Sequence, residues 1–130
     1  MGAEDNARLV RRGYEAFSAG DMATLTELFP EDAVWHLPGK GGLAGDKRGR
    51  DAVFGYFGEL MSRSGGTLKI TLHDVIGGEQ HTIGLHHDDA VRDGRVLNHN
   101  VVLVVHVTDG RLSEVWELHE DQANNDAFWS

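Results

Sequence analysis

Residues 93–119 read DGRVLNHNVVLVVHVTDGRLSEVWELH, and this stretch decides the fold. Asp93-Gly94 and Asp109-Gly110 are two-residue turn signals of the kind that join neighbouring antiparallel strands. The apolar segments beside these turns predict a long strand at Val96–Val107 and a last strand at Leu112–His119. The C-terminal half of the chain is therefore predicted to form an antiparallel sheet.

The same sheet is predicted to extend back along the chain. Apolar and polar residues alternate over residues 68–72, which is typical of a half-buried strand, and Gly77-Gly78 then turns the chain. A further strand is expected up to Val91. One short strand is expected much earlier, at Ala33–Leu37.

Three helices are predicted in the N-terminal half. Residues 9–17 have helical spacing, and Ala19-Gly20-Asp21 combines a helix terminator with the N-cap of a second helix that ends at Pro30. A third helix is expected at Arg50–Arg63. The five glycines of residues 38–49 predict a mobile loop or lid before it. Helices followed by a sheet define an α+β fold, and 130 residues suit one domain.

Composition excludes several classes of function. The formal net charge of -9, from 21 acidic and 12 basic residues, argues against nucleic acid as a partner. The absence of cysteine excludes disulfides and thiolate chemistry. The longest apolar run, Val101–Val105, is too short to cross a membrane, and no apolar leader is visible, so we expect a cytoplasmic protein.

The segment Val101–Val105 also bears on assembly. It is apolar on both faces, whereas an antiparallel sheet commonly leaves one face to water. The predicted helices can cover only one face. We therefore expect a second subunit to cover the other and form a homodimer.

Several motifs resemble a known family. The segments WHLPG at 35–39, RGRDA at 48–52 and VWELHEDQ at 115–122 resemble the SnoaL-like branch of the nuclear-transport-factor-2-like superfamily, which contains polyketide cyclases and is related to ketosteroid isomerases. The resemblance covers nearly the whole chain, so residues 1–130 are expected to form a single SnoaL-like domain. It implies a curved sheet wrapped by three helices into a cone, an internal apolar pocket, and a dimer through the convex sheet face.

The reacting groups of ketosteroid isomerases are missing. Aligned without gaps, the general base of those enzymes falls on Leu37, the oxyanion-hole tyrosine on Gly13 (beside Tyr14), and the second oxyanion-hole acid on Leu103. Proton abstraction next to a carbonyl needs a base and a group that stabilises the enolate. The chain is therefore not expected to be a ketosteroid isomerase by that mechanism.

Two polar residues of the last strand are the candidate catalytic pair. Glu117 and His119 share one strand face because they are two positions apart. Alternation alone would favour Trp116 and Leu118 as core residues, but a dimer partner that covers these two would let Glu117 and His119 face the pocket. Histidine titrates near neutral pH, so we expect His119 to act as acid or base with Glu117 or Asp121 as its partner.

Other candidates depend on the resemblance. His36, at a strand exit, either reaches the pocket mouth as a catalytic residue or is hydrogen-bonded at the strand end. His99 is either a polar group deep in the pocket or a satisfied core histidine. The expected ligand-binding residues are Tyr14, Phe17, Trp35, Leu37, Phe54, Phe57, Met61, His99, Val101 and Leu103.

Eight histidines raise the question of a metal. His86 and His87, with Asp88 and Asp89, lie in the densest group, but neighbouring strand residues point to opposite faces and cannot share one ion. The H-E-x-x-H motif is absent. We therefore expect a solvated, charged hairpin there, with no metal and no cofactor.

These features predict a small, cofactor-free enzyme of cyclase, isomerase or hydrolase type that acts by acid–base catalysis on an apolar polycyclic or polyketide-like molecule. The alternative is a non-catalytic dimeric module that binds an apolar metabolite. The orientation of Glu117 and His119 discriminates the two, because burying such a pair without a purpose is costly.

Overall fold

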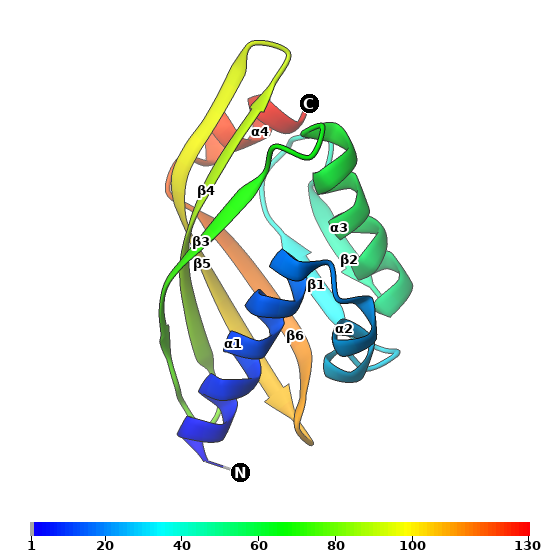
Figure 1. Ribbon diagram of the computed structural model, residues 1–130, viewed down its shortest axis with the longest axis vertical. Helices are drawn as coiled ribbons and strands as arrows, with labels where there is room; N and C mark the ends of the chain where they lie inside the picture. The colour runs from blue at the N-terminus through cyan, green and yellow to red at the C-terminus, as the bar shows by residue number, and fades with distance from the viewer. Residues whose placement is uncertain (1) are drawn as a thin grey trace.

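A curved six-stranded sheet with helices against it makes up the computed structural model, which describes residues 2–130 (Figure 1). The strand order is β2-β1-β6-β5-β4-β3. All neighbouring strands are antiparallel except β1 and β6, which pair in parallel. The elements are α1 (Ala3–Ala19), α2 (Met22–Leu28), β1 (Val34–Leu37), β2 (Gly45–Arg48), α3 (Arg50–Arg63), β3 (Lys69–Ile76), β4 (Thr82–Arg92), β5 (Arg95–Thr108), β6 (Arg111–His119) and α4 (Gln122–Trp129).

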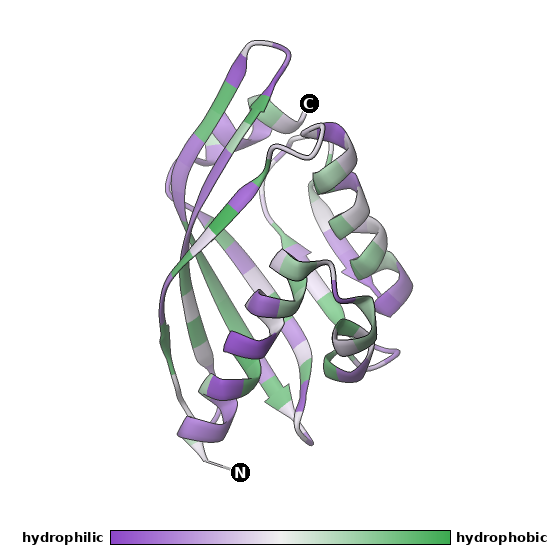
Figure 2. Cartoon of the chain, in the orientation of Figure 1, coloured by the Kyte–Doolittle hydropathy of each residue, from purple (hydrophilic) through white to green (hydrophobic). Residues whose placement is uncertain are grey.

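The helix boundaries follow local chemistry. Gly20 adopts the left-handed conformation, with φ of 67°, and ends α1. The next residue, Asp21, accepts a hydrogen bond from the backbone N–H of Thr24 and so caps α2. Figure 2 shows both hydrophobic and hydrophilic residues along α1 and α3, as expected of helices that bury one side.

The long strands place every second residue on the concave face. β4 and β5 pair in register from Arg92 with Arg95 back to Thr82 with Val105, and β6 continues the sheet on the other side of β5. Along β5, the concave-face residues Leu97, His99, Val101, Leu103 and Val105 are all buried. The core is therefore enclosed between this face and the helices.

The expected α+β fold is confirmed, with two additions. Residues 45–48, which were predicted to belong to a mobile loop, form the edge strand β2 against β1. Residues 122–129 form a fourth helix, and the carboxylate of Asp126 in that helix accepts a hydrogen bond of 3.1 Å from the backbone N–H of Lys40. The glycine-rich segment is thus held at Lys40 by α4 and at residues 45–48 by β1.

No helix within residues 2–130 is both long enough and apolar enough to cross a membrane.

Substitution Phe128→Ala tests the contribution of α4. The Phe128 side chain is fully buried, so its removal should lower the free energy of unfolding by about 3–5 kcal/mol. The control is Val96→Ala, since Val96 is 60% exposed and should change stability little. Urea unfolding of both variants measures the difference, and a near-neutral Phe128→Ala would mean that α4 is dispensable for the core.

Candidate active site

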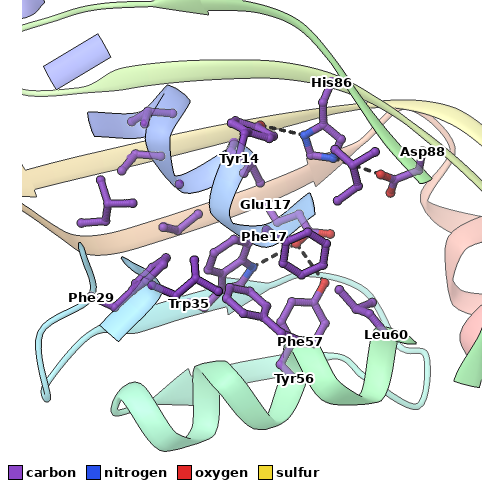
Figure 3. Close-up of a pocket in the computed structure, with 18 of the residues that line it drawn as sticks. Tyr14, Phe17, Phe29, Trp35, Tyr56, Phe57, Leu60, His86, Asp88 and Glu117 are labelled. Atoms are coloured by element: carbon purple, nitrogen blue, oxygen red, sulfur yellow. Dashed lines mark hydrogen bonds and ion pairs between the residues drawn. The ribbon is translucent and has the colours of Figure 1, made fainter. Parts of the chain in front are cut away.

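An apolar pocket lies between the concave face of the sheet and helices α1 and α3. Its cavity leaves about 80 Å³ for the centres of water-sized atoms. The half-buried lining residues Tyr14, Phe17, Leu68 and Ile70 place its mouth between α1 and β3. Further lining residues are Phe29, Trp35, Tyr56, Phe57, Leu60, His86, Asp88, Leu103, Val115 and Glu117 (Figure 3).

Glu117 is the central polar group of this pocket and is 7% exposed. Its Oε1 accepts hydrogen bonds of 3.0 Å from both the Trp35 indole N–H and the Tyr56 hydroxyl (Figure 3). Its Oε2 lies 2.6 Å from Nε2 of His119. A carboxylate has about four lone-pair sites, so three partners leave about one for a ligand.

Two histidines stand behind the carboxylate. Nδ1 of His119 lies 3.0 Å from Nε2 of His99, at hydrogen-bonding distance. The contact of His119 Nε2 with Glu117 is short but not aligned as a linear hydrogen bond. His119 can therefore carry a proton on Nε2, toward Glu117, while its Nδ1 shares a proton with Nε2 of His99. This arrangement orients the imidazole of His119 against the carboxylate.

The pKa directions agree with this assignment. Burial alone would raise the pKa of Glu117, but the short contact with His119, the charge of His119 and the hydrogen bonds from Trp35 and Tyr56 outweigh it and lower that pKa. Burial lowers the pKa of His99, and the neighbouring His119 adds to the effect. Glu117 is therefore an ionised carboxylate at the wall of an apolar cavity.

A second polar group, Tyr14 with His86 and Asp88, lines the same pocket. The Tyr14 hydroxyl lies 2.7 Å from Nδ1 of His86, and Nε2 of His86 lies 3.1 Å from Oδ1 of Asp88 (Figure 3). Burial raises the pKa of Tyr14, and the charges of Glu117 and Asp88 raise it further. With the imidazole proton toward Asp88, Tyr14 donates to Nδ1.

The approach of Tyr14 depends on a glycine of β4. A Cβ added at Gly84 would lie 2.5 Å from the Tyr14 hydroxyl oxygen and 2.8 Å from a ring carbon. Both distances are too short for any side chain, so glycine leaves the space that the tyrosine ring occupies.

Of the four residues predicted to be catalytic, the structure brings two to the pocket and places two away from it. Glu117 lines the pocket, and His119 is buried directly behind it, with 1% of its side chain exposed. Asp121 is not in the pocket, because its exposed side chain caps α4 by accepting a hydrogen bond from the N–H of Asn124. His36 does not line the pocket either, because it lies on the opposite, convex face of the sheet, beside Trp116.

His36 is held there by two carboxylates. Its Nδ1 lies 2.8 Å from Asp46 and its Nε2 lies 2.5 Å from Glu114, and its ring stacks on Trp116. The hydrogen bond with Glu114 raises the pKa of His36 despite partial burial, and Asp46 adds to the effect. The structure therefore agrees with the second interpretation of His36, a histidine that is hydrogen-bonded on a strand.

Among the predicted ligand-binding residues, Tyr14, Phe17, Trp35, Phe57 and Leu103 line the pocket. The other five do not. Met61 is 40% exposed, and His99 contacts His119 rather than the cavity. Leu37, Phe54 and Val101 belong to the surrounding core.

Tyr56, His86 and Asp88 were missed by the sequence reasoning. His86 and Asp88 were expected in a solvated hairpin, but both are buried on the concave face, at 6% and 7% exposed. The sequence did hold one indication of this placement: His86 and Asp88 are two positions apart on a strand, so they share one face. Tyr56 lay on α3 among apolar residues, with nothing local to distinguish it as a partner of Glu117.

These observations define an α+β fold with a curved sheet and an internal, mainly apolar pocket. The model of the SnoaL-like domain matches residues 10–115, so the chain belongs to the SnoaL-like family, as the resemblance implied.

Similar proteins cover almost the whole chain. An uncharacterized protein of Mycobacterium tuberculosis is 37% identical over 94% of both chains. Bal32a, from a soil-derived mobile gene cassette, is 43% identical over 98% of both chains, with a TM-score of 0.95. IdmH, a proposed polyketide cyclase from Streptomyces antibioticus, shares the fold at 22% identity over 88% of this chain and 91% of its own, with a TM-score of 0.73.

Substitution Tyr56→Phe tests the support of Glu117. It removes one donor from a buried carboxylate and should lower the free energy of unfolding by about 1.5–3 kcal/mol. In a Glu117→Gln background the same change should cost less, because the partner is no longer charged. Urea unfolding of the two single variants and the double variant measures this coupling, and additive effects would contradict the interaction.

Proposed function

We propose that this protein is an acid–base enzyme that acts on a small apolar molecule, with Glu117 as general base and His119 as the residue that positions it. The observation that carries the proposal is the ionised carboxylate of Glu117 in the wall of an apolar pocket. Burying a charge is costly, and perturbed groups in pockets gather where chemistry is done. A pocket for an apolar ligand alone would need no such group.

The second polar group supports chemistry at two points. Tyr14 faces the same pocket as Glu117 and is linked through His86 to Asp88. An imidazole between a hydroxyl and a carboxylate can relay a proton between them. Removal of a proton from carbon by Glu117, with a proton exchanged at oxygen by Tyr14, is the reaction type shared by cyclases and isomerases of carbonyl compounds.

The cavity limits the substrate. Its 80 Å³ is about half of the roughly 150 Å³ cavity that holds benzene in an engineered protein. A polycyclic or polyketide-like molecule would therefore place one reactive end beside Glu117 and extend through the apolar mouth near Phe17 and Ile70. The likeness of the fold to IdmH is consistent with such a substrate.

Hydrogen–deuterium exchange tests the base without knowledge of the natural substrate. In D₂O, the wild-type protein should accelerate exchange of the α-protons of an apolar ketone such as 2-tetralone, followed by NMR. Glu117→Gln should reduce this rate by about 10²–10⁴-fold, because the amide cannot accept the proton. The matched control is Glu59→Gln, which changes an exposed residue of α3 paired with Arg63 and should exchange at the wild-type rate.

The alternative is a binding module for an apolar metabolite. Saturable binding of the ketone without exchange above the rate in buffer would favour that function and would contradict the catalytic proposal.

The convex sheet face supports the proposal of a homodimer. Leu118 on this face is 51% exposed, and Val102, Val104 and Trp116 beside it are half-buried. A second copy of the chain is the occupant that we propose, because its convex face would present the same apolar residues.

Substitution Leu118→Asp tests this interface. Light scattering should give the wild type twice the mass of one chain, and Leu118→Asp should shift it toward the mass of one chain. Met22→Asp is the control, since Met22 is similarly exposed, at 48%, on a helix away from the sheet. A monomeric wild type at micromolar concentration would contradict the dimer.

A further inference from the structure

Three metal-ligating side chains meet behind the pocket wall. Asp88, His99 and His119 come from β4, β5 and β6, and Asp88 and His99 are direct partners in the sheet register. One nitrogen or oxygen from each residue lies within 4.8 Å of the other two. All three side chains are more than nine-tenths buried. Adjacent strands thus hold them as one compact set.

The cluster is incompletely hydrogen-bonded, and no lysine or arginine of the described residues lines the pocket beside it. Oδ1 of Asp88, Nδ1 of His99 and Nε2 of His119 are buried without an aligned hydrogen bond among the described residues. Asp88 and Glu117 bring two carboxylates to the concave face, and no lysine or arginine of residues 2–130 lines the pocket. Buried charges and polar groups are costly unless they are paired or coordinate a metal.

The separation of the two imidazoles suits an ion. Nδ1 of His119 and Nε2 of His99 are 3.0 Å apart. Two nitrogen ligands at about 2.0–2.1 Å from one ion are separated by roughly 2.9 Å at the right angle of an octahedral site and by roughly 3.4 Å at the tetrahedral angle of zinc, so 3.0 Å lies within this span. An ion bound by Nδ1 of His119 and Nε2 of His99 would replace the proton that these two nitrogens share without metal.

The residues around the cluster match the usual support of a metal site. A metal-bound histidine commonly donates its other ring N–H to a carboxylate. The other nitrogen of His119, Nε2, lies 2.6 Å from Glu117, which is itself held by Trp35 and Tyr56. Asp88, in turn, is contacted by Nε2 of His86 at 3.1 Å.

We propose that Asp88, His99 and His119 bind one divalent first-row transition-metal ion of the zinc or ferrous type. Two imidazoles and a carboxylate suit such ions, whereas magnesium and calcium prefer oxygen ligands alone. The ion would fix the ring of His119 against Glu117. The sequence reasoning missed this set because it considered neighbours in the chain, whereas the ligands come from three strands.

The test uses the full-length protein after removal of metal by a chelator. Titration with Co²⁺ should produce visible d–d absorption that saturates at one ion per chain, and Zn²⁺ should displace it and raise the melting temperature. Mg²⁺ should do neither. In NMR spectra of the wild type, Zn²⁺ should shift the ring signals of His99 and His119 but not those of His81 and His106.

Two variants locate the site. Asp88→Asn and His99→Gln should each weaken Co²⁺ binding at least about tenfold while the circular dichroism spectrum is retained. The matched control is His81→Ala, which disrupts the exposed pair formed by Nε2 of His81 and Nε2 of His106 at 2.7 Å, and it should bind like the wild type. Wild type that binds no Co²⁺ or Zn²⁺ at millimolar concentration would overturn the proposal. So would binding that is lost in His81→Ala, or Zn²⁺ shifts at His81 and His106 with none at His99 and His119.

Discussion

The buried charge of Glu117 is the constraint on which the arrangement of the pocket depends. An ionised carboxylate in an apolar wall is tolerated only where donors surround it. The donors come from β1, α3 and β6, as Trp35, Tyr56 and His119. A single carboxylate thus ties the first strand, the covering helix and the last strand to one point, and packing around it positions the aromatic walls.

The fold could be predicted from the sequence, because its signals are local. Turn dipeptides, alternation and the Gly20-Asp21 corner each act over a few residues, and they place most helices and strands correctly. β2 and α4 escaped prediction because the first is short and polar and follows a glycine-rich segment, and the second lacks a strong apolar period. They depend instead on distant contacts: β2 on its pairing with β1, and α4 on packing against β5 and β6 and on the hydrogen bond from Lys40.

The site was only partly predictable for the opposite reason. Strand periodicity could place Glu117 and His119 on one face, but the choice of face needed the whole sheet. Tyr56 reaches Glu117 across 61 residues of sequence, and His86 reaches Tyr14 across 72. Such pairs leave no trace in local spacing. The prediction for His36 overlooked strand alternation. Trp35 lines the pocket, so its neighbour His36 on the same strand points to the other face.

The parallel pairing of β1 with β6 also shapes how the chain folds. It brings together segments that are far apart in the chain, so that Trp35 meets Glu117 across 82 residues. Contacts this distant in sequence slow folding, because the entropy cost of closing a large loop comes before the stabilising contacts form. While the chain is partly folded, the carboxylate of Glu117 can remain hydrated. We expect its dehydration to coincide with the pairing of β1 and β6, because Trp35 becomes its hydrogen-bond donor only in that pairing.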